Sequence, residues 1–287
     1  MRGSRRVPGV VGYNRRMSTA ALETRTLLKV REGQSDASTD DWVVVEEPLE
    51  IRVGGETLAV VMRTPGDDLE LGAGFALTEG VVGAPEGIGT IRRCPEAKDG
   101  GENALDITLA PGFTFDPERL RRALVASAAC GLCGRASLEA LAARARASDS
   151  TLRVPRSVVL DLPRRLSAAQ GVFRRTGALH AAALFDAAGT LVVAREDVGR
   201  HNAVDKVIGR AIFDRLPLGD LILLVSGRTS FEILQKAAVA GIPMVAAVSG
   251  PTTLAIETAR AFNITLVNFL RPGGMNVASA PERIASS

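Results

Sequence analysis

Cysteine, histidine and aromatic residues are scarce in this chain of 287 residues, which contains three cysteines, two histidines and 4% aromatics. Three unevenly spaced cysteines exclude a disulfide scaffold and favour a reducing cytoplasm. No apolar run approaches the roughly 18 residues of a transmembrane helix, so we expect no membrane span. The net charge is only +3. Without a dense basic stripe or interleaved aromatic residues, a nucleic acid is not an expected partner.

Residues 1–40 differ in composition from the remainder. Their arginines stand among Gly, Pro and Ser without an apolar period, which predicts a disordered basic tail. This tail lacks the apolar middle section of a secretory signal, and Met17 is an alternative start. The rest of the chain is long enough to bury a core of Ala, Val, Leu and Ile, in one large domain or two smaller ones.

Residues 41–150 are predicted to form a smaller, β-rich α+β portion. Gly54-Gly55 is a turn signal between two Val/Ile-rich runs, so these runs predict a hairpin. Asp67 or Asp68 is expected to cap the first helix. The predicted strands are 42–53, 57–63, 90–94 and 104–109, and the predicted helices are 68–78, 117–125 and 137–147.

Residues 151–287 predict a three-layer α/β core. The strands are expected at 181–185, 191–193, 221–225, 244–248 and 265–269, and the helices at 198–216, 229–240 and 252–262. The order β-β-α-β-α-β-α-β favours a mostly parallel sheet, in which ligands bind beyond the carboxyl ends of the strands. Those ends are residues 226–229, 249–252 and 269–274, and all three segments contain glycine.

The segment Cys130-Gly131-Leu132-Cys133 holds two of the three cysteines in a glycine-containing loop. It suits a redox disulfide, half of a zinc site or a sulfur-carrying thiolate, and inert loop cysteines are also possible. A closed zinc site needs four ligands, yet no second pair at ligand spacing exists. A thioredoxin-like pair opens a helix after a strand, whereas this pair follows a predicted helix. Cys94, in a predicted strand, is expected to be a buried small hydrophobe.

The element order of the second half also matches the cytidine deaminase-like fold. Zinc deaminases carry His-x-Glu at the first core helix and Pro-Cys-x-x-Cys at the second. Here His201-Asn202-Ala203 and Ser226-Gly227-Arg228-Thr229 stand at those places. Because the glutamate and both cysteine ligands are missing, we expect no zinc.

Two loops at the strand ends are suited to an anion. Arg228 precedes a helix whose N-terminal N–H groups favour negative charge, and Arg271 lies in a Gly-rich segment that can approach phosphate closely. These loops predict a phosphorylated or nucleotide-bearing ligand, although neither a dinucleotide fingerprint nor a P-loop occurs. His201 opens a charged helix start, for which a solvated start capped by Asp197 and a functional role are both open, and its place at the rim of the strand-end loops favours the functional role. His180 fits a core histidine.

Five segments of the sequence together resemble the FdhD family, over about residues 43–284. They are residues 130–134 (CGLCG), 176–183 (TGALHAAA), 196–206 (EDVGRHNAVDK), 226–232 (SGRTSFE) and 268–273 (NFLRPG). Five motifs in the same order make this resemblance specific.

The resemblance implies a cytoplasmic, homodimeric sulfurtransferase with a deaminase-like core. Such a protein carries sulfur from a cysteine desulfurase to the molybdenum cofactor bis-molybdopterin guanine dinucleotide, for formate dehydrogenase. Its persulfide residue maps to Cys130, with Cys133 assisting. The implied cofactor contacts are Phe269, Leu270, Arg271, Pro272, Gly273 and Gly274, to which the strand-end argument adds Arg228 and His201. The alternative is a chaperone that only shields the cofactor, and such a protein would not need the cysteine pair.

Overall fold

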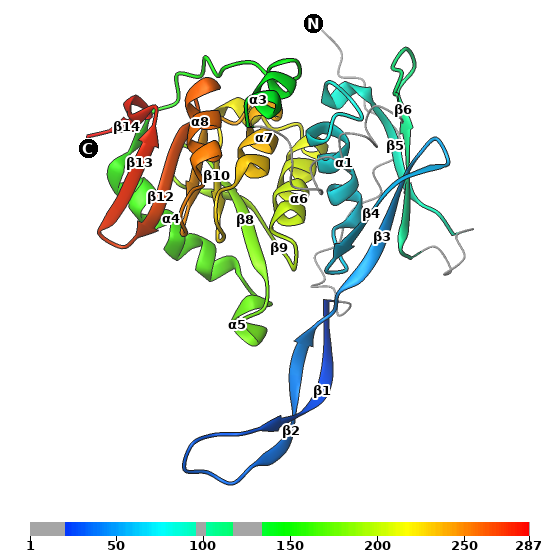
Figure 1. Ribbon diagram of the computed structural model, residues 1–287, viewed down its shortest axis with the longest axis vertical. Helices are drawn as coiled ribbons and strands as arrows, with labels where there is room; N and C mark the ends of the chain where they lie inside the picture. Colours follow the sequence, from blue (N-terminus) through cyan, green and yellow to red (C-terminus); the bar gives the residue numbers. More distant parts are fainter. Residues whose placement is uncertain (1–20, 96–101, 117–133, 287) are drawn as a thin grey trace, which may run out of the picture.

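The computed structural model describes residues 21–95, 102–116 and 134–286 and contains three parts (Figure 1). These are a β-hairpin that extends away from the body, a four-stranded sheet with one helix, and a six-stranded sheet with helices on both faces. None of the described helices is long and apolar enough to cross a membrane.

The six-stranded sheet is mixed. Its order is β13-β12-β11-β10-β8-β9, and only the pairs β10–β11 and β11–β12 are parallel. The expectation of a mostly parallel sheet was therefore wrong, because the hairpin β8–β9 joins the sheet through an antiparallel β8–β10 pair and β13 pairs antiparallel with β12 at the other edge. The strands are β8 (His180–Phe185), β9 (Leu191–Asp197), β10 (Ile222–Val225), β11 (Met244–Ala247), β12 (Thr265–Arg271) and β13 (Gly274–Ser279).

Alternate residues of these strands build two separate cores. Ala182 and Leu184 of β8 pack toward α6 (Arg200–Phe213), α7 (Phe231–Val239) and α8 (Thr253–Ala261). Ala181, Ala183 and Phe185 pack on the opposite face against α4 (Arg156–Ala169). The predicted order β-β-α-β-α-β-α-β from β8 to β12 is confirmed. The helix α4 was not predicted.

The four-stranded sheet has the order β4-β3-β6-β5, with β3 and β6 parallel. Its elements are β3 (Glu47–Val53), β4 (Glu56–Arg63), α1 (Asp68–Thr78), β5 (Ile88–Arg93) and β6 (Ala104–Leu109). The predicted hairpin, helix and later strands are confirmed to within two residues, apart from the start of the first strand. The predicted cap is not, because the Asp67 side chain makes no capping hydrogen bond and lies 3.2 Å from Arg195.

The projecting hairpin corrects the prediction of a disordered tail through residue 40. Strands β1 (Leu22–Lys29) and β2 (Ala37–Val44) pair antiparallel, so the predicted strand 42–53 is really the end of β2 and all of β3. One face of the hairpin carries the ion pairs Arg25–Glu23 and Lys29–Asp41. Because many of its residues are polar, the hairpin lacks the alternation of apolar and polar residues that indicates a strand. Residues 1–20 of the predicted tail lie outside the described residues.

The remaining elements are short or connect the larger ones. Helix α3 starts earlier than the predicted 137–147, and the predicted helix 117–125 falls outside the described residues. These elements are α3 (Gly134–Ala142), α5 (Phe173–Thr176), β7 (Val154–Pro155) paired with β14 (Ile284–Ala285), and the 3-10 turns Pro85–Gly87, Leu218–Asp220 and Pro281–Arg283.

Helices α1 and α6 join the two sheets by crossing at backbone contact distance. A Cβ atom on Gly74 would lie 2.0 Å from the carbonyl oxygen of Asp205, and one on Gly209 would lie 1.8 Å from that of Glu70. The obstructing atoms belong to helix backbone, which cannot move aside locally. Glycine is therefore a steric requirement of this crossing at both positions.

Replacing Gly209 by Ala is expected to lower the free energy of unfolding by about 3 kcal/mol or more, because the methyl group forces α1 away from α6. An unobstructed helical Gly→Ala exchange would stabilise by about 1 kcal/mol. Denaturant unfolding measures the difference. Gly219→Ala is the control, since the nearest atom to its added Cβ lies 3.8 Å away. Equal stability of Gly209→Ala and wild type would contradict the tight crossing.

Candidate functional site

The three loops at the strand ends form one continuous edge, as predicted. Thr229 donates its backbone N–H to Gly250 O at 3.2 Å, and Thr252 donates to Thr229 O at 3.0 Å. The side chain of Asn268 adds a hydrogen bond from Nδ2 to Thr229 Oγ1 at 2.8 Å. The ends of β10, β11 and β12 are thus held together by hydrogen bonds.

The predicted segment 269–274 is a hairpin rather than an open exit loop. Phe269 and Arg271 are exposed, whereas the Leu270 side chain is fully buried in the core against α4. Leu270 can therefore offer a ligand only its backbone. Pro272 and Gly273 form the turn into β13, which begins at Gly274, and Gly273 takes a φ of 86° that favours glycine.

The two histidines lie at this same edge. A Cβ atom on Gly227 would lie 3.4 Å from His180 Nδ1 and 3.9 Å from Arg200 Cδ, so His180 and Arg200 approach the β10 end together. His180 is only partly buried and is not the core histidine that the sequence favoured. Burial and then the charges of Arg200 and Arg228 lower the pKa of His180.

His201 is neutral at physiological pH. Burial, followed by the positive charges of Arg200 and Lys236, lowers the pKa of its imidazole to about 4, although Glu232 and Glu79 act in the opposite direction. A neutral imidazole can donate or accept a hydrogen bond but cannot pair with a phosphate as a cation. The cations of the predicted site that remain exposed are Arg228 and Arg271.

Several buried side-chain atoms near this edge lack a hydrogen-bond partner among the described residues. They include Arg200 Nε, His201 Nε2 and Asn268 Oδ1. Each such atom costs about 1–3 kcal/mol of stability, and groups of this kind are typical of sites that a ligand completes. The residues therefore fit a polar ligand at the edge.

Asp197 positions the start of α6 from inside the protein. Its carboxylate lies 2.7 Å from Lys206 Nζ and accepts backbone hydrogen bonds from Gly199 and Thr64 at 2.8 and 3.2 Å. Because Asp197 and Lys206 are fully buried, the interpretation of this segment as a solvated, Asp197-capped helix start was wrong. Sequence alone gave no indication that the charges point inward.

A second buried ion network lies between α1, α6 and α7. Lys236 Nζ contacts Glu79 at 2.6 Å, Asp205 at 2.8 Å and Thr78 Oγ1 at 3.0 Å. Burial raises the pKa of Asp205 to about 6, and the charges of Lys236 and Glu79 act on it in opposite directions. Sequence analysis missed this network, because a lysine in an apolar helix is normally placed at the surface.

Cys130 and Cys133, the predicted sulfur-carrying pair, lie outside the described residues. Helix α3 begins at Gly134, the residue that follows Cys133. Cys94 is 7% exposed at the end of β5, and the prediction that it is buried is confirmed. In the described part of the chain, no three His, Cys, Asp or Glu side chains come together as a metal-binding group.

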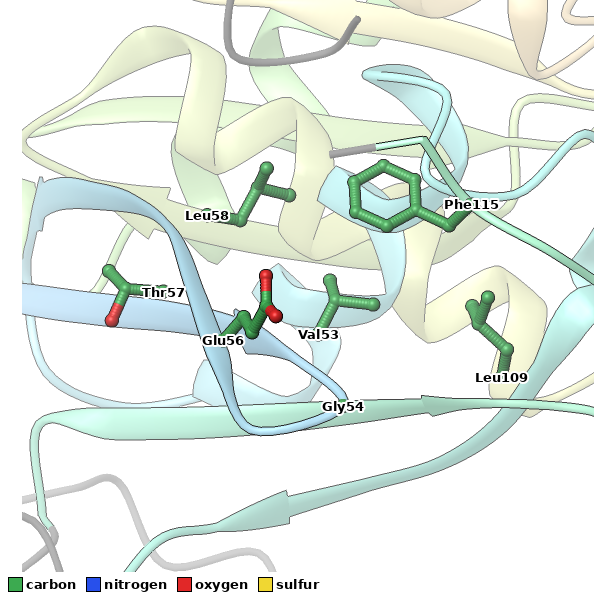
Figure 2. Close-up of a pocket in the computed structure, with 7 residues that line it drawn as sticks. All are labelled: Val53, Gly54, Glu56, Thr57, Leu58, Leu109 and Phe115. Atoms are coloured by element: carbon green, nitrogen blue, oxygen red, sulfur yellow. The ribbon is translucent and has the colours of Figure 1, made fainter. Parts of the chain in front are cut away.

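A hollow of about 390 Å³ lies apart from this edge, at the β3–β4 turn, and its lining is largely apolar (Figure 2). Glu56 is its one charged residue, so it has none of the chemistry of a phosphate site. Its lining is Val53, Gly54, Glu56, Thr57, Leu58, Leu109 and Phe115.

Comparison with known proteins decides the family. The FdhD/NarQ family model matches residues 44–285. The chain belongs to the FdhD/NarQ family. The resemblance drawn from the five motifs is therefore confirmed, and the match leaves out the hairpin strand β1, as the sequence-based limits did.

Members of the family are similar to this chain over nearly its whole length. Sulfur carrier protein FdhD of Streptomyces coelicolor is 48% identical over 270 residues, covering 92% of this chain and 95% of the relative. The FdhD protein of Mycobacterium tuberculosis is 49% identical over 251 residues, covering 84% and 91%. A crystal structure from Desulfotalea psychrophila, assigned as a formate dehydrogenase accessory protein, has a TM-score of 0.74 at 26% identity, covering 92% and 100%.

His201 should make the protein less stable in acid. The pKa of its imidazole is about 4 in the folded chain and 6.5 ordinarily, so only the unfolded chain binds the proton in between. The contribution of His201 to the free energy of unfolding therefore falls as pH drops from 6.5 to 4. His201→Gln should lose part of this fall, as measured by urea unfolding across that range. Asp205, whose pKa is raised to about 6, raises the free energy of unfolding as pH falls, but it does so equally in wild type and His201→Gln. Parallel pH profiles would refute the neutral, buried imidazole.

Proposed function

We propose that this chain is a sulfur carrier that accepts persulfide sulfur from a cysteine desulfurase and transfers it to bis-molybdopterin guanine dinucleotide, for use by formate dehydrogenase. The supporting observation is the cysteine pair of residues 130–133 in a chain 48% identical to a sulfur carrier protein over almost its full length. The finer identification of the second half as a deaminase-like core, a cytoplasmic location and a homodimeric state belong to the same proposal.

The chemistry rests on the two thiols. Cys130 accepts the sulfur atom as Cys130–S–SH. Attack of the Cys133 thiolate on the inner sulfur forms the Cys130–Cys133 disulfide and releases the outer sulfur as hydrosulfide. Alternatively, Cys133 relays the outer sulfur. A free thiol has a pKa of about 8.5, which positive charge and helix N-termini lower. Arg135 is the nearest cation in sequence, and α3 begins directly after Cys133.

The cofactor enters this mechanism as substrate, and the strand-end edge has the groups that would bind it. A guanine dinucleotide carries pyrophosphate groups and planar rings. Arg228 and Arg271 are exposed cations at this edge, and Phe269, two residues before Arg271, is an exposed aromatic ring. One guanidinium nitrogen of Arg271 donates to Val248 O at 2.8 Å, which anchors the side chain and leaves its other nitrogens for an anion.

Cys130→Ala should abolish the sulfur adduct of about 32 Da that the protein gains on incubation with a desulfurase and cysteine, together with formate dehydrogenase maturation. Cys133→Ala should keep some adduct and lose part or all of the maturation activity. Intact-protein mass spectrometry reads the adduct. Cys94→Ala is the control, since this buried thiol is expected to be dispensable. A Cys130→Ala variant that still accepts sulfur and still matures the enzyme would favour the shielding chaperone instead.

Arg271→Ala should weaken the binding of a guanine nucleotide by about ten- to a hundredfold, because a charge-assisted contact of about 1.5–3 kcal/mol is lost. Isothermal titration calorimetry with GDP measures this loss. Arg164→Ala is the matched control, as Arg164 is an exposed arginine of α4 paired with Asp161 at 2.6 Å. An unchanged GDP affinity in Arg271→Ala would count against the strand-end edge as the cofactor site.

A further inference from the structure

Phe269 is held in a conformation that its residue type rarely adopts. Its φ is 51°, in the left-handed region, where a bulky side chain is an outlier. Its neighbours Asn268 and Leu270 are 1% and 0% exposed, whereas Phe269 itself is 49% exposed. The register between β12 and β13 shifts between Asn268 and Arg271. The strand thus turns one aromatic ring outward between two buried residues.

The contacts around Phe269 fix this conformation. Its backbone N–H donates to Ser249 O at 3.1 Å. On either side, Asn268 Nδ2 bonds Thr229 Oγ1 at 2.8 Å and an Arg271 guanidinium nitrogen bonds Val248 O at 2.8 Å. Strained residues held in this way are concentrated at ligand sites. The surrounding hydrogen bonds therefore hold the Phe269 ring in its exposed position at the edge.

The Phe269 ring packs against Gly250, where a side chain would occupy the same space. A Cβ atom on Gly250 would lie 2.7 Å from Phe269 Cζ, closer than real Cβ contacts, and 3.1 Å from Cε1. Gly250 does not have a positive φ, so its backbone conformation does not itself require glycine. The lack of a side chain is needed at this position to let the Phe269 ring lie against the loop.

We propose that Gly250 is a positioning residue that sets the plane of the Phe269 ring, and that this ring stacks on the heteroaromatic base of the bound ligand. The inference rests on the proposed function, since it assigns to the base of the nucleotide a contact separate from its phosphates. The phosphates would be bound by Arg271, which is two residues from Phe269, and by Arg228. Arg228 precedes Thr229, whose hydroxyl accepts a hydrogen bond from Asn268. Stacking on an aromatic side chain is effective for any planar base.

The test is a double-mutant cycle of Phe269→Ala and Gly250→Ala, in which isothermal titration calorimetry measures the affinity for two probes, GDP and inorganic pyrophosphate. Phe269→Ala should weaken GDP binding about tenfold, in the range that base stacking gives. Gly250→Ala should weaken it by a similar factor, because the added methyl group displaces the ring. Neither substitution should change pyrophosphate affinity. In the Phe269→Ala background, Gly250→Ala should cause no further loss, since the ring that it displaces is gone.

Thermal unfolding separates positioning from general damage. Gly250→Ala should lower the melting temperature of wild type but not that of Phe269→Ala, and Gly83→Ala, whose Cβ would meet no atom within 4 Å, should leave both GDP affinity and melting temperature unchanged. If Gly250→Ala does not fold, the double variant should, and a double variant that also fails overturns the proposal.

Two results distinguish this inference from the proposed function. A wild-type protein that binds neither GDP nor pyrophosphate overturns this inference together with the strand-end edge as the cofactor site, whereas the sulfur adduct on Cys130 tests the carrier function separately. A wild type that binds GDP, with Arg271→Ala weakened but Gly250→Ala unaffected, overturns the role of Gly250 alone. The same holds if the loss caused by Gly250→Ala persists when Phe269 is absent.

Discussion

The crossing of α1 and α6 at backbone contact distance is the constraint on which the rest of this structure depends. Gly74 and Gly209 remove the side chains that normally separate two packed helices. Because α1 carries the four-stranded sheet and α6 follows β9 of the six-stranded sheet, one crossing fixes the relative position of both halves. It also brings polar residues of α1, including Glu70 and Thr78, within hydrogen-bond distance of Arg195 and Asp205.

Buried charges make this arrangement specific. Lys206 pairs with Asp197, and Lys236 pairs with Asp205 and with the partly buried Glu79. Buried ion pairs contribute little net stability, but loss of one partner costs about 3–5 kcal/mol. A different packing of α1 on α6 would remove Glu79 and Thr78 from Lys236 and the Thr64 carbonyl from Lys206. The network therefore selects one register, in which Asp197 holds the start of α6 and so places Arg200 and His201 at the strand-end edge.

The sequence predicts the local elements of this chain better than their assembly. Continuous apolar runs and Gly turns located β10, β11 and β12 to within a few residues, because such patterns follow directly from burial on both faces. The predicted edge from residue 226 to 274 came together for the same reason. The inward direction of Asp197, Lys206 and Lys236 was not predictable, because each charge is buried only by the presence of its partner on another element. The hairpin β1–β2 was missed because its strands are exposed on both faces and carry no apolar period.

The charges at the strand-end edge favour an anion, and the edge lacks the cysteine and glutamate motifs with which zinc deaminases bind and use their metal. Helices α6, α7 and α8 all begin there, and each helix N-terminus contributes partial positive charge. Arg200, Arg228 and Arg271 add full charges, and burial with Arg200 keeps His201 neutral. Zinc-binding cysteines are thiolates, whose negative charge would offset such a field. Segment 226–229 holds no acidic or thiol side chain, and Arg228 adds to the positive charge, which favours an anionic ligand over a metal.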